Sequence, residues 1–331
     1  MSRGWNIAIA VLFVLFSYLL LQFFFSTQHI RELVKPAGDN GIGNGSRHVV
    51  LIAQEVDNPY WRTIEQGVRE AADNYGMDVE YTGPIRIHAA EQIRLLERAI
   101  AAKPDAIMVQ GINDPQQRLL IDKAAVQGIP IITVDADEPD SHRLSYIGTD
   151  NLKAGKMMGE LVAQAAAGTK GSIGVLIANE QSYSQQLRLA GFRSVLSRYP
   201  ELTVVDVRPS NNSRLQATRE AEEMLMQHAG KIDTMIGFSA LDSIGILKAA
   251  EHVHPQRLSI LAFDDLAETK AAIRQCRIRA TIVQRPYAMG YGAITMLNDY
   301  FQGRKPEQQR FTEATVLTSG ESGSDTGGSC P

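Results

Sequence analysis

Polar side chains follow several apolar segments of this sequence at the point where each segment ends. Their amide and carboxylate groups are planar, and they offer paired donors or acceptors that can bridge neighbouring hydroxyl groups. A single polar residue in such a place is as often an ordinary loop residue, but together the set favours a polar small-molecule site. The residues are Gln54, Asp135, Ser239, Asp264 and Gln284, which follow VVLIA, PIITV, TMIGF, SILAF and ATIV.

Two aromatic residues lie close to the first of these positions. Tyr60 and Trp61 follow Asn58 and Pro59, and their flat apolar faces suit the C–H face of a sugar ring. An aromatic residue in the first turn of a helix is often simply core. We therefore expect one of the two to contact ligand and the other to pack.

The apolar segments alternate with stretches of helical periodicity. Most of the apolar segments are continuous, as expected for strands covered by helices on both faces. Trp61, Ile64, Val68 and Ala71 form one helical face, and Ile93, Leu96 and Ile100 form another. The alternation predicts an α/β fold with parallel, doubly wound sheets. The strand candidates are too many for one sheet of this size, which predicts two lobes. Ligands of such sheets bind beyond the carboxyl ends of the strands.

The N-terminal segment predicts a membrane anchor. Residues 6–26 carry no charge and are long enough to cross the hydrocarbon layer. Phe23, Phe24 and Phe25 make a poor cleavage site, so we expect the anchor to be retained. The basic residues on either side do not decide its orientation. Residues 27–46 are predicted to form a flexible linker, and 320–331 a disordered tail.

Composition excludes several classes of protein. The 33 basic and 37 acidic residues give a net charge of −4 without a basic stripe, so we expect no nucleic-acid partner. His252 and His254 lack a third ligand, and the glycine pattern forms no phosphate loop, so no metal or cofactor is expected. Two cysteines are too few for a disulfide framework, and we expect no bridge between Cys276 and Cys330.

Several motifs, taken in order, resemble the periplasmic sugar-binding proteins of the ribose-binding type, which are related to the ligand-binding cores of LacI-type repressors. The resemblance covers about residues 47–319. The motifs that carry it are DNPYWRTIEQGVREAA, IPIITVDAD, IGTDN at 147–151, QQLRLAGF at 185–192, ILAFDD at 260–265 and TIVQRPYAMG at 281–290.

The resemblance implies a set of ligand contacts, position by position. Arg188 is the strongest of them, since RLAGF is expected to place its guanidinium at the start of a helix facing the ligand. Ala136, Asn212 and Ser239 depart from the pattern of ribose binders, so another pentose, a hexose or a polyol fits equally well. The implied contacts are Gln54, Asn58, Tyr60, Trp61, Asp135, Arg188, Asn212, Ser239, Asp264 and Gln284.

The resemblance also implies how the lobes are connected. The chain is expected to cross between lobes near 148–150, 284–285 and 311–312. The first lobe would comprise 47–148 and 285–311, and the second 149–284 and 312–319. Closure about this three-crossing hinge would bury the ligand, so that the conformation of the protein depends on whether ligand is bound.

Binding without catalysis is the function expected. Adjacent acids such as Asp264 and Asp265 do not suit the paired carboxylates of a glycosidase, so we expect no enzyme. A hydrophobic segment stands where a repressor would have its helix-turn-helix. Two partners remain for an extracytoplasmic, single-pass binding protein of the cell membrane. A membrane histidine kinase would make it a sensor, which the anchor favours, and an ABC permease would make it a transport component.

Overall fold

The computed structural model describes residues 13, 20, 22, 46–255 and 257–320. Apart from Phe13, Leu20, Gln22, Ser46 and Gly320, the predicted anchor (6–26), linker (27–46) and tail (320–331) lie outside the described residues. Within the described part of the chain, no helix is both long and apolar enough to cross a membrane.

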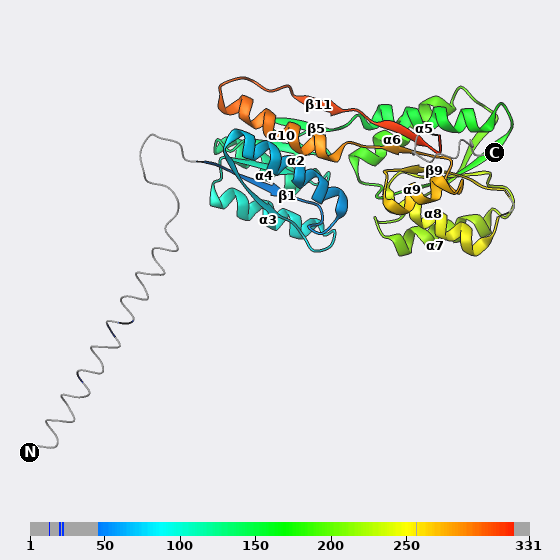
Figure 1. Cartoon of the computed structure of the whole chain (residues 1–331), viewed down its shortest axis with the longest axis horizontal. Coiled ribbons are helices and arrows are strands. Elements are labelled where there is room, and N and C mark those ends of the chain that lie inside the picture. Colours follow the sequence, from blue (N-terminus) through cyan, green and yellow to red (C-terminus); the bar gives the residue numbers. More distant parts are fainter. Residues whose placement is uncertain (1–12, 14–19, 21, 23–45, 256, 321–331) are drawn as a thin grey trace, which may run out of the picture. The chain divides into compact units, whose positions relative to one another are not determined.

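From Arg47 onward the chain forms one compact unit that contains two six-stranded sheets (Figure 1). The first sheet has the strand order β11-β5-β4-β3-β1-β2, and all its pairs are parallel. Its strands are β1 (Arg47–Ile52), β2 (Met77–Thr82), β3 (Ala106–Val109), β4 (Ile131–Val134), β5 (Ser145–Thr149) and β11 (Gln309–Thr312).

The second sheet repeats the same pattern of strands. Its order is β12-β10-β9-β8-β6-β7, and its pairs are parallel except for the antiparallel pair of β10 with β12. The strands are β6 (Gly171–Ile177), β7 (Leu202–Pro209), β8 (Thr234–Gly237), β9 (Ser259–Phe263), β10 (Ala280–Val283) and β12 (Thr315–Thr318). The two parallel-sheet lobes predicted from the alternation of strands and helices are therefore present.

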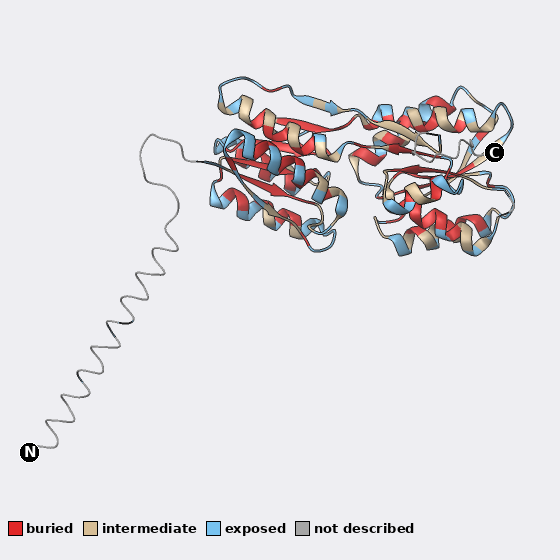
Figure 2. Ribbon diagram, viewed as in Figure 1, coloured by how far each residue is buried: buried red, intermediate tan, exposed pale blue. Residues whose placement is uncertain are grey.

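Helices cover both faces of each sheet, and the buried residues follow the strands (Figure 2). On the first sheet, α2 and α10 pack on one face, and α3 and α4 on the other. On the second sheet, α5 and α6 cover one face, and α7, α8 and α9 the other. The bounds are α2 (Pro59–Tyr75), α3 (Ala89–Ala102), α4 (Pro115–Val126), α5 (Asn151–Ala166), α6 (Tyr183–Leu196), α7 (Arg214–Gln227), α8 (Ala240–Val253), α9 (Ala267–Arg274) and α10 (Pro286–Phe301).

Local sequence explains where the first helix after β1 begins and ends. The side chain of Asn58 accepts a hydrogen bond from the backbone N–H of Tyr60, and Pro59 occupies the first turn, where it costs no hydrogen bond. Gly76 ends the helix with a φ of 67°, a conformation that glycine adopts without steric cost. Tyr60 is thereby fixed at the carboxyl end of the first sheet.

The helices α5 and α6 approach each other through glycine. A Cβ added at Gly155 would lie 2.0 Å from the backbone oxygen of Arg188, and one at Gly191 would lie 2.1 Å from that of Leu152. The backbones of these two helices are therefore in direct contact, and one of the contacts is at Arg188.

The chain passes from the first sheet to the second after β5, returns after β10 and passes again after β11. The sequence pattern does not predict β2, β5, β11 or β12. The edge strand β2 is only partly buried, and β5, although buried, has five residues that include Ser145, Gly148 and Thr149.

The prediction of no disulfide is wrong for one of the two cysteines. Cys276 is disulfide-bonded. The prediction rested on its charged surroundings between Arg274 and Arg279, which do not prevent a bridge. Cys330, the other cysteine, lies outside the described residues.

Candidate ligand-binding site

The first lobe places an aspartate at the centre of a small polar cluster. Asp135 follows β4 directly and has a φ of 70°, an uncommon conformation for a residue with a side chain. One carboxylate oxygen accepts a hydrogen bond from the hydroxyl of Tyr60 at 2.7 Å, and the other accepts one from the amide of Gln110 at 2.7 Å. Three elements, α2, β3 and β4, therefore converge on one carboxylate.

Burial controls the protonation of this first cluster. It raises the pKa of Asp135, while the hydrogen bond from Tyr60, the charge of Arg188 and the hydrogen bond from Gln110 pull it down. Burial, followed by the negative charge of Asp135, holds the pKa of Tyr60 well above its ordinary value. Tyr60 is therefore a hydrogen-bond donor at physiological pH.

The second lobe places a guanidinium at the centre of its cluster. Arg188 lies in α6 and is 4% exposed. Its Nε donates to the side-chain oxygen of Asn151 at 2.7 Å, and one terminal nitrogen donates to the backbone oxygen of Phe238 at 2.7 Å. The guanidinium lies 3.9 Å from the centre of the Phe263 ring, a cation–π contact.

Gln284 connects the guanidinium to a second aspartate. Its side-chain oxygen accepts from Arg188 at 3.1 Å, and its amide donates to Asp264 at 2.9 Å. The hydroxyl of Thr149 also donates to that oxygen, at 2.7 Å. Thr149 and Gln284 lie where the chain passes between the sheets, so this residue pair joins two of the crossings.

The two clusters influence each other electrostatically. Asp264 follows β9 with a φ of 65°, and burial raises its pKa to about 6. The positive charge of Arg188 lowers this pKa, and the negative charge of Asp135 raises it. Arg188 lowers the pKa of Asp135 as well. One guanidinium thus compensates two carboxylates, one from each lobe.

The structure brings half of the predicted contacts into this network. Tyr60, Asp135, Arg188, Asp264 and Gln284 are joined by the hydrogen bonds and charges described above. Among the residues that the structure describes, the other predicted contacts are not hydrogen-bonded to these five side chains; they are Gln54, Asn58, Trp61, Asn212 and Ser239.

These other residues have local roles. Trp61 is 2% exposed in the core of the first lobe, as expected for the aromatic residue that packs. Asn58 and Ser239 cap α2 and α8 through their side-chain oxygens. Asn212, with a φ of 53°, donates its backbone N–H to Ala178, and Gln54 is half-buried in the loop after β1.

Sequence reasoning missed three residues of the site. Gln110 directly follows the apolar strand β3 (AIMV), so the rule that found Gln54 and Asp135 could have found it. Asn151 orients Arg188 from the start of α5, and it is the last residue of the IGTDN motif at 147–151. Asp242, at the third position of α8, is fully buried.

Asp242 is a carboxyl group buried in the first turn of α8. Both of its oxygens are shielded from solvent, and its polar neighbours are the hydroxyls of Ser210 and Ser239. Burial raises the pKa of Asp242 to about 6, and the nearby hydroxyls of Ser210 and Ser239 offset only part of this effect.

Two hollows lie away from this network. One, of about 360 Å³, adjoins the segments that pass between the sheets; the other, of about 640 Å³, lies at the amino ends of β1 and β3. None of the predicted contacts lines either of them. The lining residues include Asp150, Lys153, Met157, Phe311 and Glu313 for the first, and Arg47, Lys103, Asp105, Tyr300 and Phe301 for the second.

A model of the periplasmic binding protein domain matches residues 49–305, most of the chain. The chain belongs to this family. The glucose-galactose binding protein GanP of Geobacillus stearothermophilus is 35% identical to this periplasmic binding protein, with a TM-score of 0.81 over 83% of this chain and 98% of the other. XylFII, in its complex with LytSN, is 30% identical with a TM-score of 0.78, over 84% of this chain and all of the other.

Curated relatives of this periplasmic binding protein are more distant in sequence. The D-apiose import binding protein of Paraburkholderia graminis is 23% identical over 86% of this chain and 91% of its own length. The ribose import binding protein of Haemophilus influenzae is 23% identical over 82% of this chain and 91% of its own. The predicted family is therefore confirmed.

Proposed function

We propose that this periplasmic binding protein binds a small sugar or polyol outside the cytoplasm, without catalysis, and closes its lobes around it. The observation that carries the proposal is the pair of clusters, Tyr60–Asp135–Gln110 and Arg188–Gln284–Asp264, which present planar polar groups from the carboxyl ends of both sheets. Such groups bridge neighbouring hydroxyls, as the ring of a sugar presents them.

The charges of the site favour a neutral ligand that donates hydrogen bonds. Three nitrogens of Arg188 already donate to Asn151, Phe238 and Gln284. An anionic ligand would have to compete with Asp135 and Asp264 for the same guanidinium. The two carboxylates keep acceptor capacity and suit hydroxyl groups.

The names of the relatives agree with this class of ligand. GanP is a glucose-galactose binding protein, and the curated relatives bind D-apiose and ribose during import. Pentoses and hexoses are therefore both candidates for the present chain.

We propose the predicted lobe boundaries, 47–148 with 285–311 and 149–284 with 312–319, as the two bodies that close. The hydrogen bond from Thr149 to Gln284 lies between the first two crossings, and Gln284 also contacts Arg188 and Asp264. A ligand that contacts these side chains would thus act directly on the hinge.

The first candidate role for lobe closure is ligand sensing. A protein held at the cell membrane by residues 6–26 would present its closed form to a membrane histidine kinase. XylFII was solved in complex with a second protein, LytSN, which supports a partner protein for this chain.

A transport role is the alternative, and the curated relatives favour it because they are import binding proteins. In that case the closed form would deliver its sugar to an ABC permease. Gene deletion separates the two roles. A sensor loses sugar-dependent phosphorylation of its kinase while uptake persists, and a transport component loses uptake.

A thermal-shift screen of the full-length chain in detergent tests the binding proposal. The panel contains D-ribose, D-arabinose, D-xylose, D-glucose, D-galactose and the matching polyols. A ligand that binds only the native state raises the melting temperature. No shift with any of them at millimolar concentration would contradict the proposal.

A further inference from the structure

One hydrogen bond joins the lobes away from the crossings. The side-chain amide of Asn113, in the loop between β3 and α4, donates to the backbone oxygen of Gln181 at 2.8 Å. Gln181 lies between β6 and α6 of the second lobe, and the side chain of Asn179 accepts from its backbone N–H at 2.8 Å. β3 and β6 are interior strands of their sheets, whereas the strands beside the crossings, β11 and β12, lie at the edges. This hydrogen bond is therefore separate from the hinge.

The orientation of the Asn113 side chain is fixed by its two partners. Its oxygen accepts from the guanidinium of Arg118 at 3.1 Å, and arginine can only donate. The backbone oxygen of Gln181 can only accept, so the amide nitrogen must face the second lobe. Asn113 has a φ of 55°, in the left-handed region that asparagine tolerates better than most residues.

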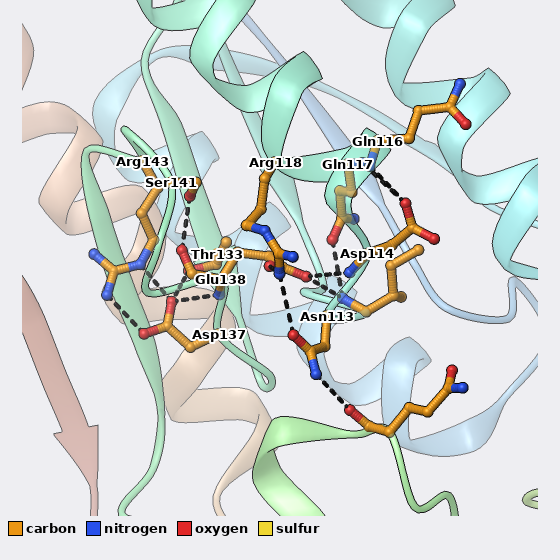
Figure 3. Close-up of polar contacts among 12 residues, drawn as sticks. Asn113, Asp114, Gln116, Gln117, Arg118, Thr133, Asp137, Glu138, Ser141 and Arg143 are labelled. Carbon is orange, nitrogen blue, oxygen red and sulfur yellow. Dashed lines mark hydrogen bonds and ion pairs between the residues drawn. The ribbon is translucent and has the colours of Figure 1, made fainter.

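A buried glutamate holds this loop in place (Figure 3). Glu138 is fully buried, and its carboxylate accepts from the backbone N–H groups of Ile112 at 3.0 Å and Asp114 at 3.2 Å, the two neighbours of Asn113. Its other oxygen accepts from Arg118 at 3.2 Å. Glu138 therefore fixes both the backbone around Asn113 and the arginine that orients its side chain.

The same loop carries a residue of the ligand site. Gln110 donates to Asp135, the backbone N–H of Gly111 donates to Ala136 at 2.8 Å, and Ile112 donates to Glu138. A Cβ added at Gly111 would lie 2.4 Å from the backbone oxygen of Asp137, so the two loops are in close contact. Residues 110–114 and 135–138 thus form one hydrogen-bonded unit.

We propose that Asn113 is a latch between the lobes, and that Glu138 is the positioning residue that couples this latch to the ligand contacts of the first lobe. The coupling rests on the proposed function, whereas the latch itself does not. A ligand held by Asp135 fixes the loop pair, and the fixed loop pair presents Asn113 to Gln181.

The test follows lobe closure in the full-length chain by single-molecule energy transfer, without sugar. Dyes are attached through Val126→Cys and Met226→Cys, two exposed positions on α4 and α7. We expect Asn113→Ala to lower the ratio of closed to open molecules about threefold, as the loss of one solvent-exposed hydrogen bond implies. Asn113→Asp, which turns a carboxylate oxygen toward Gln181, should lower it about tenfold.

The matched control is Gln116→Ala, an exposed amide in the first turn of α4 whose side chain has no hydrogen bond to the second lobe among the described residues. Closed fractions equal to this control in both Asn113 variants would overturn the latch. Glu138→Gln should match Asn113→Ala, and the double variant should show no further loss. Additive losses, or no loss in Glu138→Gln, would overturn the positioning role.

A second arm adds D-galactose and separates this inference from the proposed function. A shift of the closed fraction in the Asn113 variants without sugar supports the latch, even where D-galactose has no effect on any variant. Where D-galactose binds, the latch predicts faster sugar dissociation from Asn113→Ala than from Gln116→Ala, and equal rates would count against it.

Discussion

The side-chain oxygen of Gln284 accepts a hydrogen bond from Arg188 at 3.1 Å. Gln284 directly follows β10, where the chain leaves the second sheet, and Arg188 lies in α6 of the same lobe. The pair links the guanidinium of the candidate site to the hinge, because Thr149 donates to the same oxygen. Ligand contact and hinge geometry therefore share one amide group.

Replacement of Arg188 should abolish sugar binding and lower stability. Arg188→Ala removes the donors to Asn151, Phe238 and Gln284, and it leaves Asp264 without its compensating charge. We expect the free energy of unfolding to fall by about 3 kcal/mol, and the variant to show no measurable heat of binding with sugar. Calorimetry and chemical denaturation check both. Arg198→Ala, which breaks an exposed pair with Glu160, is the control and should change neither.

Asp242 should make the protein less stable as pH rises. Burial raises its folded pKa from 3.8 to about 6, so the native state binds this proton more tightly than the unfolded state does. The stability is therefore fully present below about pH 4 and is lost by about pH 6, a change of about 3 kcal/mol. Asp242→Asn should equal the parent at pH 4 and exceed it by the same amount, about 3 kcal/mol, at pH 7.5. A variant that is less stable at pH 7.5 would contradict this.

Sugar affinity should fall in acid because of Asp264. Hydroxyl groups of a ligand donate to its ionised form, so binding favours the carboxylate and lowers a pKa that stands at about 6 without ligand. The affinity is then constant above that pH and declines about tenfold per pH unit below it. Asp264→Asn should bind more weakly and lose this decline, as titrations at pH 5 and pH 7.5 would show. If the affinity of Asp264→Asn for sugar still declines in acid, a group other than Asp264 causes the decline.

Gly155→Ala should disturb the site from behind. The added Cβ would lie 2.0 Å from the backbone oxygen of Arg188, so α5 and α6 must separate. We expect a loss of about 2 kcal/mol in stability, together with weaker sugar binding. Lys156→Ala, at an exposed position of the same helix, should leave both unchanged. Normal binding in Gly155→Ala would mean that the helix pair can adjust without moving Arg188.

Much of the fold could be predicted from sequence because its strands are continuously apolar. Segments such as VVLIA and SILAF are buried on both faces and end in the polar residues that form the site. β2 escaped prediction because it is a half-exposed edge strand, and β11 and β12 because they are four-residue strands near the hinge. Partly exposed strands of this kind lack the signal that burial imposes.

The site was predictable in part for the same reason. Asp135, Asp264 and Gln284 follow strands directly, and the rule for parallel sheets places them together. Residue type alone does not identify a ligand contact: Trp61 has a flat apolar ring that would suit a sugar, but it packs in the core. Asp242 and Glu138 are charged residues that the sequence gives no reason to bury. Their positions follow from the packing of loops, which no local pattern encodes.

Titration calorimetry of the full-length chain with pentoses, hexoses and polyols is the most direct test of the central claim, that the two polar clusters bind one neutral polyhydroxylated ligand. We predict saturable, one-to-one binding of at least one sugar, and its loss in both Asp135→Ala and Asp264→Ala, one variant from each lobe. Binding that survives in either variant, or no binding of any member of the panel, would contradict it.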